Sequence, residues 1–262
     1  MISIIVSTHK PDIYQNFSEN LKKTIGIEYE LIGIENYALY SICEAYNLGI
    51  KQAKYPFLCF VHEDIIFKTP NWGKRMISLM ENDQNIGLIG VAGSKFKSSY
   101  PLSGWGQGPS LNKFKRGQIT HYYDNNELYE DFDLSSEKKE VEEVVCLDGI
   151  FLFTKNEVLN HCKFDDKTLN YFHGYDTDFS LQVFFKNYKV IVDRKIELIH
   201  YSKGNYNKEY TQANKKIWKK WLCKLPVASK DLKMSKTDML KTDMINWFYS
   251  GNDTIKRKLK ML

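Results

Sequence analysis

The sequence predicts an α/β protein in which helices cover both faces of a mostly parallel sheet. Short apolar runs alternate with helix-like segments through the first part of the chain. The first run, residues 2–7, is continuous and rich in β-branched side chains, as expected for a strand buried on both faces. The order strand, helix, strand then repeats up to a run at 86–92, and this order implies parallel pairing with crossover helices.

The first repeats have local signals for each element. A turn at Lys10-Pro11-Asp12 precedes a helical stretch at 13–24, and a second strand spans 29–35. Ser41 and Glu44 have the spacing of a capping box, which predicts a helix after residue 41. A third buried strand (57–62), a helix (about 71–82) and a fourth strand (86–92) follow.

The middle of the chain has a different character. Residues 93–140 contain a glycine-rich piece and an acidic, aromatic stretch, and we interpret them as long loops with a strand near 117–123. Order resumes with the apolar run 144–153. The remaining predicted elements are a short helix capped by Thr154 with Glu157, a helix at 176–187, strands at 188–193 and 196–201, and basic amphipathic helices over 206–262.

Length and composition favour one sizeable core with an appendage. The chain has 262 residues, of which 43% are hydrophobic, and we divide it into an α/β domain over 1–204 and a basic helical extension over 205–262. From Lys203 onward the chain is rich in lysine and holds few acids. Such a tail suggests peripheral contact with an anionic membrane, and we expect no nucleic acid partner. The alternative is a solvated helical face.

Cysteine usage and hydropathy predict a cytoplasmic protein. The five cysteines are scattered without CxxC spacing, which is typical of reduced thiols rather than of a disulfide framework or a zinc site. Residues 1–7 are too short for a signal peptide, and no run approaches the roughly 20 apolar residues of a membrane-spanning helix. Any membrane association is therefore expected to be peripheral.

Polar residues follow three of the predicted parallel strands. They are Ser7-Thr8-His9, Glu35-Asn36 and His62-Glu63-Asp64, and ligands of open α/β sheets bind at this end of the strands. The sequence has no GxGxxG after the first strand and no GxxxxGK[ST] motif, so glycine-rich phosphate cradles are disfavoured. A divalent ion on carboxylates, Mg²⁺ or Mn²⁺, would neutralise phosphate in their place.

An ordered set of motifs over residues 1–202 resembles the family-two-like glycosyltransferases of the GT-A fold. No single motif decides the resemblance, but the set occurs in order and at sensible intervals, and residues beyond 205 lie outside it. The motifs are Ser7-Thr8, the acid Glu35, Ala45-Tyr46-Asn47-Leu48-Gly49-Ile50, Phe60-Val61-His62-Glu63-Asp64, Leu147-Asp148-Gly149, His173-Gly174-Tyr175-Asp176-Thr177-Asp178-Phe179 and Ile199-His200-Tyr201.

The resemblance implies a donor pocket. Thr8 and Glu35 would line the nucleoside site, and Asn47 would support it from its helix, with the alternative that Asn47 only satisfies a neighbouring loop. Glu63 belongs to the segment that occupies the place of the family's DxD motif and would contact the donor. Trp105, between glycines, would belong to a lid over the donor, and its alternative is an exposed loop.

The resemblance also implies a metal and a base. Asp64 would ligate a cation that bridges the donor's phosphates, and His200 would complete the site. The sequence departs from the family pattern at His62, where aspartate is usual, and imidazole suits Mn²⁺ better than Mg²⁺. Asp176 falls at the place of the catalytic base, although aspartate also serves as a helix N-cap, the interpretation we favour for Asp178.

The function implied is transfer of a sugar from a UDP- or GDP-linked donor to a hydroxyl acceptor, such as a glycan or lipid-linked glycan of a cell-envelope polysaccharide. One carboxylate base, Asp176, would give inversion by single displacement. Two alternatives remain open at this point. The chain could bind a nucleotide-sugar without catalysis, or it could be a sugar nucleotidyltransferase, for which a glycine-rich basic loop after the first strand is expected and absent.

Overall fold

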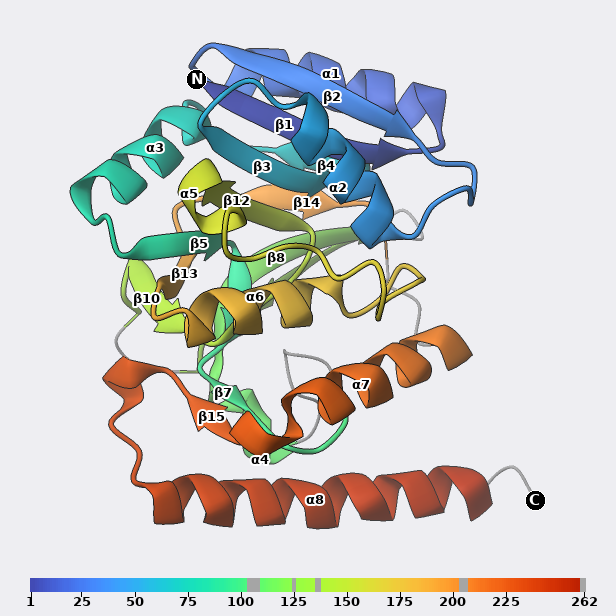
Figure 1. The fold of residues 1–262 in the computed structure, drawn as a ribbon, viewed down its shortest axis with the longest axis vertical. Helices are drawn as coiled ribbons and strands as arrows, with labels where there is room; N and C mark the ends of the chain where they lie inside the picture. The colour runs from blue at the N-terminus through green and yellow to red at the C-terminus, as the bar shows by residue number, and fades with distance from the viewer. Residues whose placement is uncertain (103–108, 124–125, 135–137, 203–206, 260–262) are drawn as a thin grey trace.

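The computed structural model describes residues 1–102, 109–123, 126–134, 138–202 and 207–259. A seven-stranded sheet has the order β10-β13-β5-β12-β3-β1-β2 (Figure 1). All its strands except β12 and β10 run in one direction, so the mostly parallel α/β sheet is confirmed. The strands are β1 (Ile2–Thr8), β2 (Tyr29–Glu35), β3 (Phe57–His62), β5 (Ile86–Gly90), β10 (Val141–Val144), β12 (Phe151–Lys155) and β13 (Lys189–Asp193).

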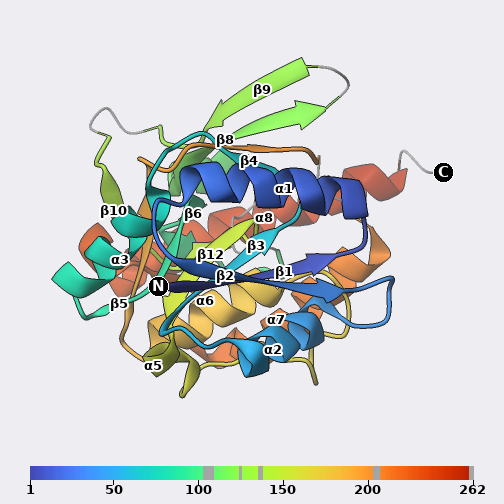
Figure 2. The ribbon, with the colours of Figure 1, turned by 90° about the horizontal axis from the view of Figure 1, so that it is seen from above.

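Helices bury both faces of this sheet, as Figure 2 shows from above. On one face Phe17 and Trp72 pack against Ile4, while on the other Tyr46 and Phe179 pack in the cluster that contains Ile5. Alternate residues of β1 thus enter opposite cores, which explains its unbroken apolar sequence. The helices are α1 (Pro11–Thr24) and α3 (Trp72–Asn82) on the first face, and α2 (Ile42–Gln52) and α6 (Tyr175–Phe185) on the second.

A six-stranded sheet packs beside the first and takes up much of the middle of the chain. Its order is β11-β6-β8-β14-β4, with β9 paired to β8. Its strands are β4 (Ile65–Phe67), β6 (Ala92–Ser94), β8 (Lys115–Tyr123), β9 (Asn126–Asp131), β11 (Cys146–Leu147) and β14 (Leu198–His200). The remaining short elements are β7 (Phe96–Lys97), paired with β15 (Val227–Ala228), α4 (Pro109–Asn112) and α5 (Asn156–Leu159).

The interpretation of 93–140 as long loops is wrong for much of its described part, although the strand near 117–123 is confirmed within β8. Ion pairs bury polar side chains in this region. Arg116 of β8 is buried against Glu142 of β10, and Asp133 lies 3.7 Å from the same guanidinium. Because the strands are stabilised by paired charges, their sequence lacks the apolar pattern on which the prediction depended.

The run 144–153 divides among three strands that belong to both sheets. The predicted cap by Thr154 is also wrong, since its hydroxyl donates to the Gly87 carbonyl at 2.7 Å, and the α5 N-cap residue is Lys155. Thr154 lies inside the buried strand β12, one residue before the N-cap position, and its side chain points to the neighbouring strand instead of to the first turn of α5.

The C-terminal part forms two longer helices, α7 (Lys208–Trp221) and α8 (Lys236–Leu259), with 3₁₀ turns η1 (Leu222–Lys224) and η2 (Lys230–Leu232) between them. Ala213, Ile217 and Trp221 of α7 belong to the same core cluster as β3 and α6. The division at residue 204 stays a prediction. None of the helices in the described part of the chain has the length and apolarity needed to cross a membrane.

Asp178 attaches α7 to the α/β body, so its interpretation as an N-cap is wrong. Gly174 occupies the N-cap position of α6, and the Asp178 carboxylate is 1% exposed. It accepts a hydrogen bond from Trp221 Nε1 at 2.7 Å and pairs with Lys220 Nζ at 2.9 Å. The sequence places these partners more than forty residues away, beyond the reach of local pattern reasoning.

We expect Asp178→Ala to lower the free energy of unfolding by about 3 kcal/mol, because it leaves a buried indole N–H and a lysine without their partner. Chemical denaturation monitored by tryptophan fluorescence measures the change. Glu81→Ala, at an exposed carboxylate of α3, is the matched control and should change stability by less than about 0.5 kcal/mol. Equal midpoints for Asp178→Ala and wild type would contradict this role.

Candidate functional site

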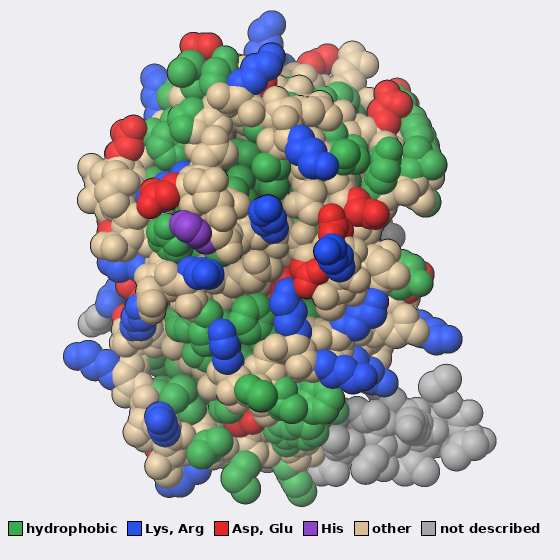
Figure 3. All heavy atoms as spheres, in the orientation of Figure 1, with side chains coloured by type: hydrophobic (Ala, Val, Ile, Leu, Met, Phe, Trp, Pro, Cys, Tyr) green, Lys and Arg blue, Asp and Glu red, His purple; other side chains and the backbone are tan. Residues whose placement is uncertain are grey.

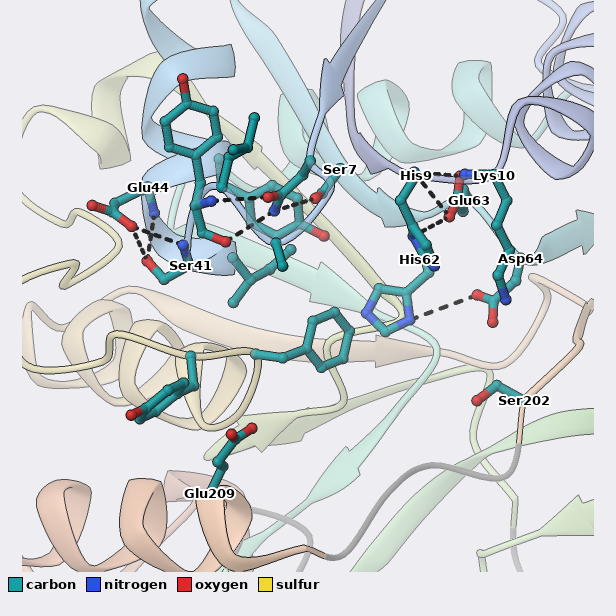
Figure 4. A pocket seen from close by; sticks show the side chains of 18 of the residues that line it. Ser7, His9, Lys10, Ser41, Glu44, His62, Glu63, Asp64, Ser202 and Glu209 are labelled. Atoms are coloured by element: carbon teal, nitrogen blue, oxygen red, sulfur yellow. Dashed lines mark hydrogen bonds and ion pairs between the residues drawn. The ribbon is translucent and has the colours of Figure 1, made fainter.

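A cleft of about 740 Å³ opens where the parallel strands β1 and β3 end (Figure 4). Its wall combines the strand ends with the loop after β2, the start of α2, the segment before α6 and the end of β14. The residues that line it are Ser7, His9, Lys10, Ile13, Asn36, Ala38, Leu39, Tyr40, Ser41, Ile42, Glu44, Tyr46, His62, Glu63, Asp64, Asn170, Tyr171, Phe172, His200, Ser202 and Glu209.

His62, Asp64 and His200 converge in this wall. Each offers one ligand atom, and the three atoms lie within 4.8 Å of one another. Asp64 Oδ1 is 3.4 Å from His200 Nε2 and 3.9 Å from His62 Nδ1. His62 ends β3, Asp64 lies in the turn to β4, and β4 pairs with β14, which brings His200 alongside. Two imidazoles and a carboxylate form a donor set suited to Mn²⁺.

The protonation states of this group fit a cation. Burial acts to raise the pKa of Asp64, but the neighbouring His200 and His62 outweigh it and hold the pKa at about 2. Burial also lowers the pKa of His62, with His200 adding to the effect, so this imidazole stays neutral near pH 7. Nδ1 of the buried His200 has no hydrogen-bond partner among the described residues, and its Nε2 faces Asp64 Oδ1 across 3.4 Å. Buried imidazole nitrogens beside an ionised carboxylate fit the donor set of a cation site.

Tyr175 orients His62. Its hydroxyl donates to the Gly149 carbonyl at 3.0 Å and lies 2.7 Å from His62 Nε2. This contact fixes the orientation of the imidazole, whose Nδ1 lies 3.9 Å from Asp64 Oδ1. A His62 ring protonated on Nε2 would present the Nδ1 lone pair to a metal ion beside Asp64.

Glu63 faces the turn between β1 and α1 and is buried. Its carboxylate accepts a hydrogen bond from the Thr8 hydroxyl at 2.6 Å and contacts the backbone N–H groups of His9 and Lys10 at 3.3 to 3.4 Å. The His9 ring lies 2.8 Å away. Glu63 therefore holds the turn that presents His9 and Lys10 to the cleft (Figure 4).

The other end of the cleft is built around Asn36. Its amide donates to Ser7 Oγ and to the Tyr40 carbonyl, both at 3.1 Å, and accepts from Tyr40 N–H at 2.9 Å. Ser41 and Glu44 form the capping box expected from the sequence and begin α2 at this point. These bonds shape a loop that offers polar groups and an exposed Tyr40 ring to a ligand.

Comparison with known proteins decides the family. The model described as "Glycosyltransferase like family" matches residues 3–221. The chain belongs to this family. No curated protein matches it.

A solved structure supports the GT-A fold of this glycosyltransferase-like chain. It is similar to GalNAc-T7, solved with UDP, GalNAc and Mn²⁺, with a TM-score of 0.59 and 11% identity over 85% of this chain and 49% of that one. This chain therefore spans about half the length of the GalNAc-T7 chain. A second match is A197 from STIV, with a TM-score of 0.42, 13% identity and coverage of 77% and 86%. At such identities the likeness concerns the fold alone.

The fold of the glycosyltransferase-like chain separates the predicted site residues into two groups. His62, Glu63, Asp64 and His200 line the cleft together, whereas Thr8 lies behind it against Glu63. Outside the cleft lining, Glu35 is exposed at the end of β2, and Asn47 donates to the Phe164 carbonyl and to Asp166. Trp105 lies outside the described residues. The nucleotide-binding roles of Thr8, Glu35, Asn47 and Trp105 stay predictions.

Asp176 is the second residue of α6, keeps partial solvent exposure and is not among the residues that line the cleft. Its Oδ1 accepts the Thr177 N–H at 2.7 Å. Burial, and next the negative charge of Asp148, raise its pKa to about 7. A carboxylate whose pKa lies near neutrality is suited to proton transfer.

Sequence reasoning missed the aromatic residues at the mouth of the cleft. Tyr171 and Phe172 are exposed and line it, and the Phe172 ring lies 5.4 Å from the His62 ring. In the sequence, Tyr171 and Phe172 stand directly before the His173–Phe179 motif, and this position could have indicated a ligand contact. Exposed aromatic rings beside a polar site often contact ligands.

If His62, Asp64 and His200 bind a cation together, His200→Asn should weaken Mn²⁺ binding about tenfold or more, because it would remove one of the three candidate ligands. Titration calorimetry, or the electron paramagnetic resonance signal of free Mn²⁺, measures the affinity. His121→Asn is the matched control, since its ring lies 5.3 Å from that of His200 but outside the ligand group. Wild-type affinity in His200→Asn, or equal loss in both variants, would argue against this site.

Proposed function

We propose that the chain transfers a sugar from a UDP- or GDP-linked donor to a hydroxyl group of a glycan or lipid-linked glycan, with inversion at the anomeric carbon. The observation that carries the proposal is the convergence of His62, Asp64 and His200 in a cleft at the carboxyl ends of β1 and β3. Ligands of α/β sheets bind at this edge. Membership of the glycosyltransferase-like family supports sugar transfer.

The diphosphate would lie against His62, Asp64 and His200, with the nucleoside toward Asn36 and Tyr40. A bound Mn²⁺ would act as a Lewis acid that stabilises the departing nucleoside diphosphate. Two imidazole ligands favour Mn²⁺ over Mg²⁺. The presence of UDP and Mn²⁺ in the solved GalNAc-T7 structure supports this assignment through the shared fold. Lys10, at the cleft wall, adds positive charge for the phosphates.

Asp176 would accept the proton of the attacking hydroxyl. Its neighbour in the sequence, Tyr175, contacts His62 at 2.7 Å, which supports a place for Asp176 near the candidate metal ligands. Its raised pKa keeps the carboxylate basic enough to take a proton near pH 7. Phe172 offers its exposed ring to the apolar face of a sugar at the mouth of the cleft.

Asp176→Asn should lower the transfer rate at least about 100-fold while leaving donor affinity within about twofold, because it removes the base but keeps the shape of the side chain. Transfer from UDP- and GDP-sugars with Mn²⁺ measures the rate, and calorimetry with UDP or GDP measures binding. A variant that transfers sugar at the wild-type rate would overturn the assignment of Asp176. A wild-type chain that binds these nucleotides but neither transfers nor hydrolyses any donor would favour a binding protein without catalysis.

Thermal unfolding provides the folding control for this variant. The pKa of Asp176 is raised from 3.8 to about 7, so ionising this carboxyl costs the folded state stability as pH rises from about 4 to 7. Asparagine cannot ionise and avoids that cost. At pH 8 the Asp176→Asn chain should therefore unfold at a temperature no lower than wild type, and a lower value would attribute lost activity to misfolding.

The pH dependence of transfer tests the coupling between the two aspartates. The rate of the wild type should rise with pH up to about 7, because the Asp176 carboxylate must be unprotonated to accept a proton. Asp148→Asn removes the neighbouring negative charge that contributes to the raised pKa, so the rise should move to lower pH. An unchanged pH profile in Asp148→Asn would show that another group sets it.

A further inference from the structure

Helix α8 buries polar side chains against the body while it exposes large apolar ones. Asp243 and Asn246, which it turns toward the protein, are 6% and 0% exposed. Asp243 accepts hydrogen bonds from Ser98 Oγ at 2.5 Å and from the Ser99 N–H at 2.8 Å, and Asn246 donates to Ser98 Oγ at 2.9 Å. These hydrogen bonds attach this part of the helix to the body, together with Met239, which packs against the buried cluster of Phe96, Leu111 and Phe114.

The outward side of the same helix is apolar. Leu240 and Met244 are 55% and 71% exposed, and they lie one turn apart on one face. Ile245 and Phe248 are also exposed, whereas the Trp247 ring packs edge-on against Tyr100 and its Nε1 donates to Ser99 Oγ at 2.8 Å. Figure 3 shows hydrophobic side chains projecting at the lower edge of the molecule, where Figure 1 places α8. An exposed apolar patch of large side chains marks a surface that binds a partner.

Charge identifies the partner. From residue 203 to 262 the chain has fifteen lysines and arginines against five acids, whereas residues 1–202 have twenty-two against twenty-seven. Lys236 and Lys241, both exposed, lie on the stretch of α8 that carries the apolar side chains. A helix with apolar and aromatic side chains on one face and lysines beside them suits the boundary between anionic headgroups and acyl chains.

We infer that α8 lies in the interface of an anionic lipid bilayer, with Leu240, Met244 and their apolar neighbours inserted and the lysines at the phosphate level. A second copy of this chain fits the surface less well, because it would bring one lysine-rich face against another. The inference does not depend on the proposed sugar transfer, since α8 contributes no residue to the cleft lining.

Sedimentation of the full chain with vesicles tests this inference. Wild type should bind vesicles of phosphatidylcholine with 30 mol% phosphatidylglycerol, and binding should fall about tenfold or more with phosphatidylcholine alone or in 0.5 M NaCl. Leu240→Gln/Met244→Gln should lose at least about tenfold in affinity. The matched control is Leu134→Gln, which changes a leucine that is 69% exposed outside α8 and should bind like wild type.

The charge contribution has its own pair of variants. Lys236→Glu/Lys241→Glu should lose about tenfold or more in affinity, whereas Lys22→Glu/Lys23→Glu, at exposed lysines near the end of α1, should retain most of it. Three results would each overturn the inference: no binding of wild type to anionic vesicles, equal binding by the α8 variants and their controls, or a concentration-dependent dimer in sedimentation velocity that the Leu240→Gln/Met244→Gln substitution abolishes.

Discussion

The turn at Glu63 and Asp64 joins the two sheets, and the candidate site depends on this junction. β3 belongs to the seven-stranded sheet and β4 to the six-stranded one, with only these two residues between them. In-register pairing of β1 with β3 sets Ser7 beside His62, and pairing of β4 with β14 sets Ile65 opposite His200. The Asp64 carbonyl also accepts the Tyr201 N–H at 2.8 Å. Asp64 thus meets His62 from one sheet and His200 from the other.

This junction is held by polar contacts that would be costly to lose. The buried Glu63 carboxylate accepts hydrogen bonds from the Thr8 hydroxyl and from the His9 N–H at the start of the β1–α1 connection. These bonds fix one side of the turn between β3 and β4. Nδ1 of His200 is buried without a hydrogen bond to a described residue, and an unpaired buried group costs about 1–3 kcal/mol. In the proposed site, a cation bound between His200 and Asp64 would offset that cost.

The sequence predicted the elements whose burial follows a simple pattern and missed those stabilised by pairing of charges. The unbroken run of β1 and the capping box at Ser41 each had one local explanation. Arg116 in β8 had none, because its strand is stabilised by an acid on another strand. In the site, the ends of the predicted strands indicated where His62 and Asp64 lie. The hydrogen-bond partners of Asn47 and Asp178 are more than forty residues away in the sequence, so no local pattern predicts them.

Crystallography of the chain with UDP and MnCl₂ tests the central claim most directly, because anomalous scattering locates manganese independently of activity. The account predicts one strong peak between the Asp64 carboxylate and the rings of His62 and His200, with all three side chains as ligands. The diphosphate should be on the side of the cleft that holds Asn36. Manganese bound elsewhere, with the three side chains unmoved and unliganded, would contradict the claim that the junction of the sheets is a metal site.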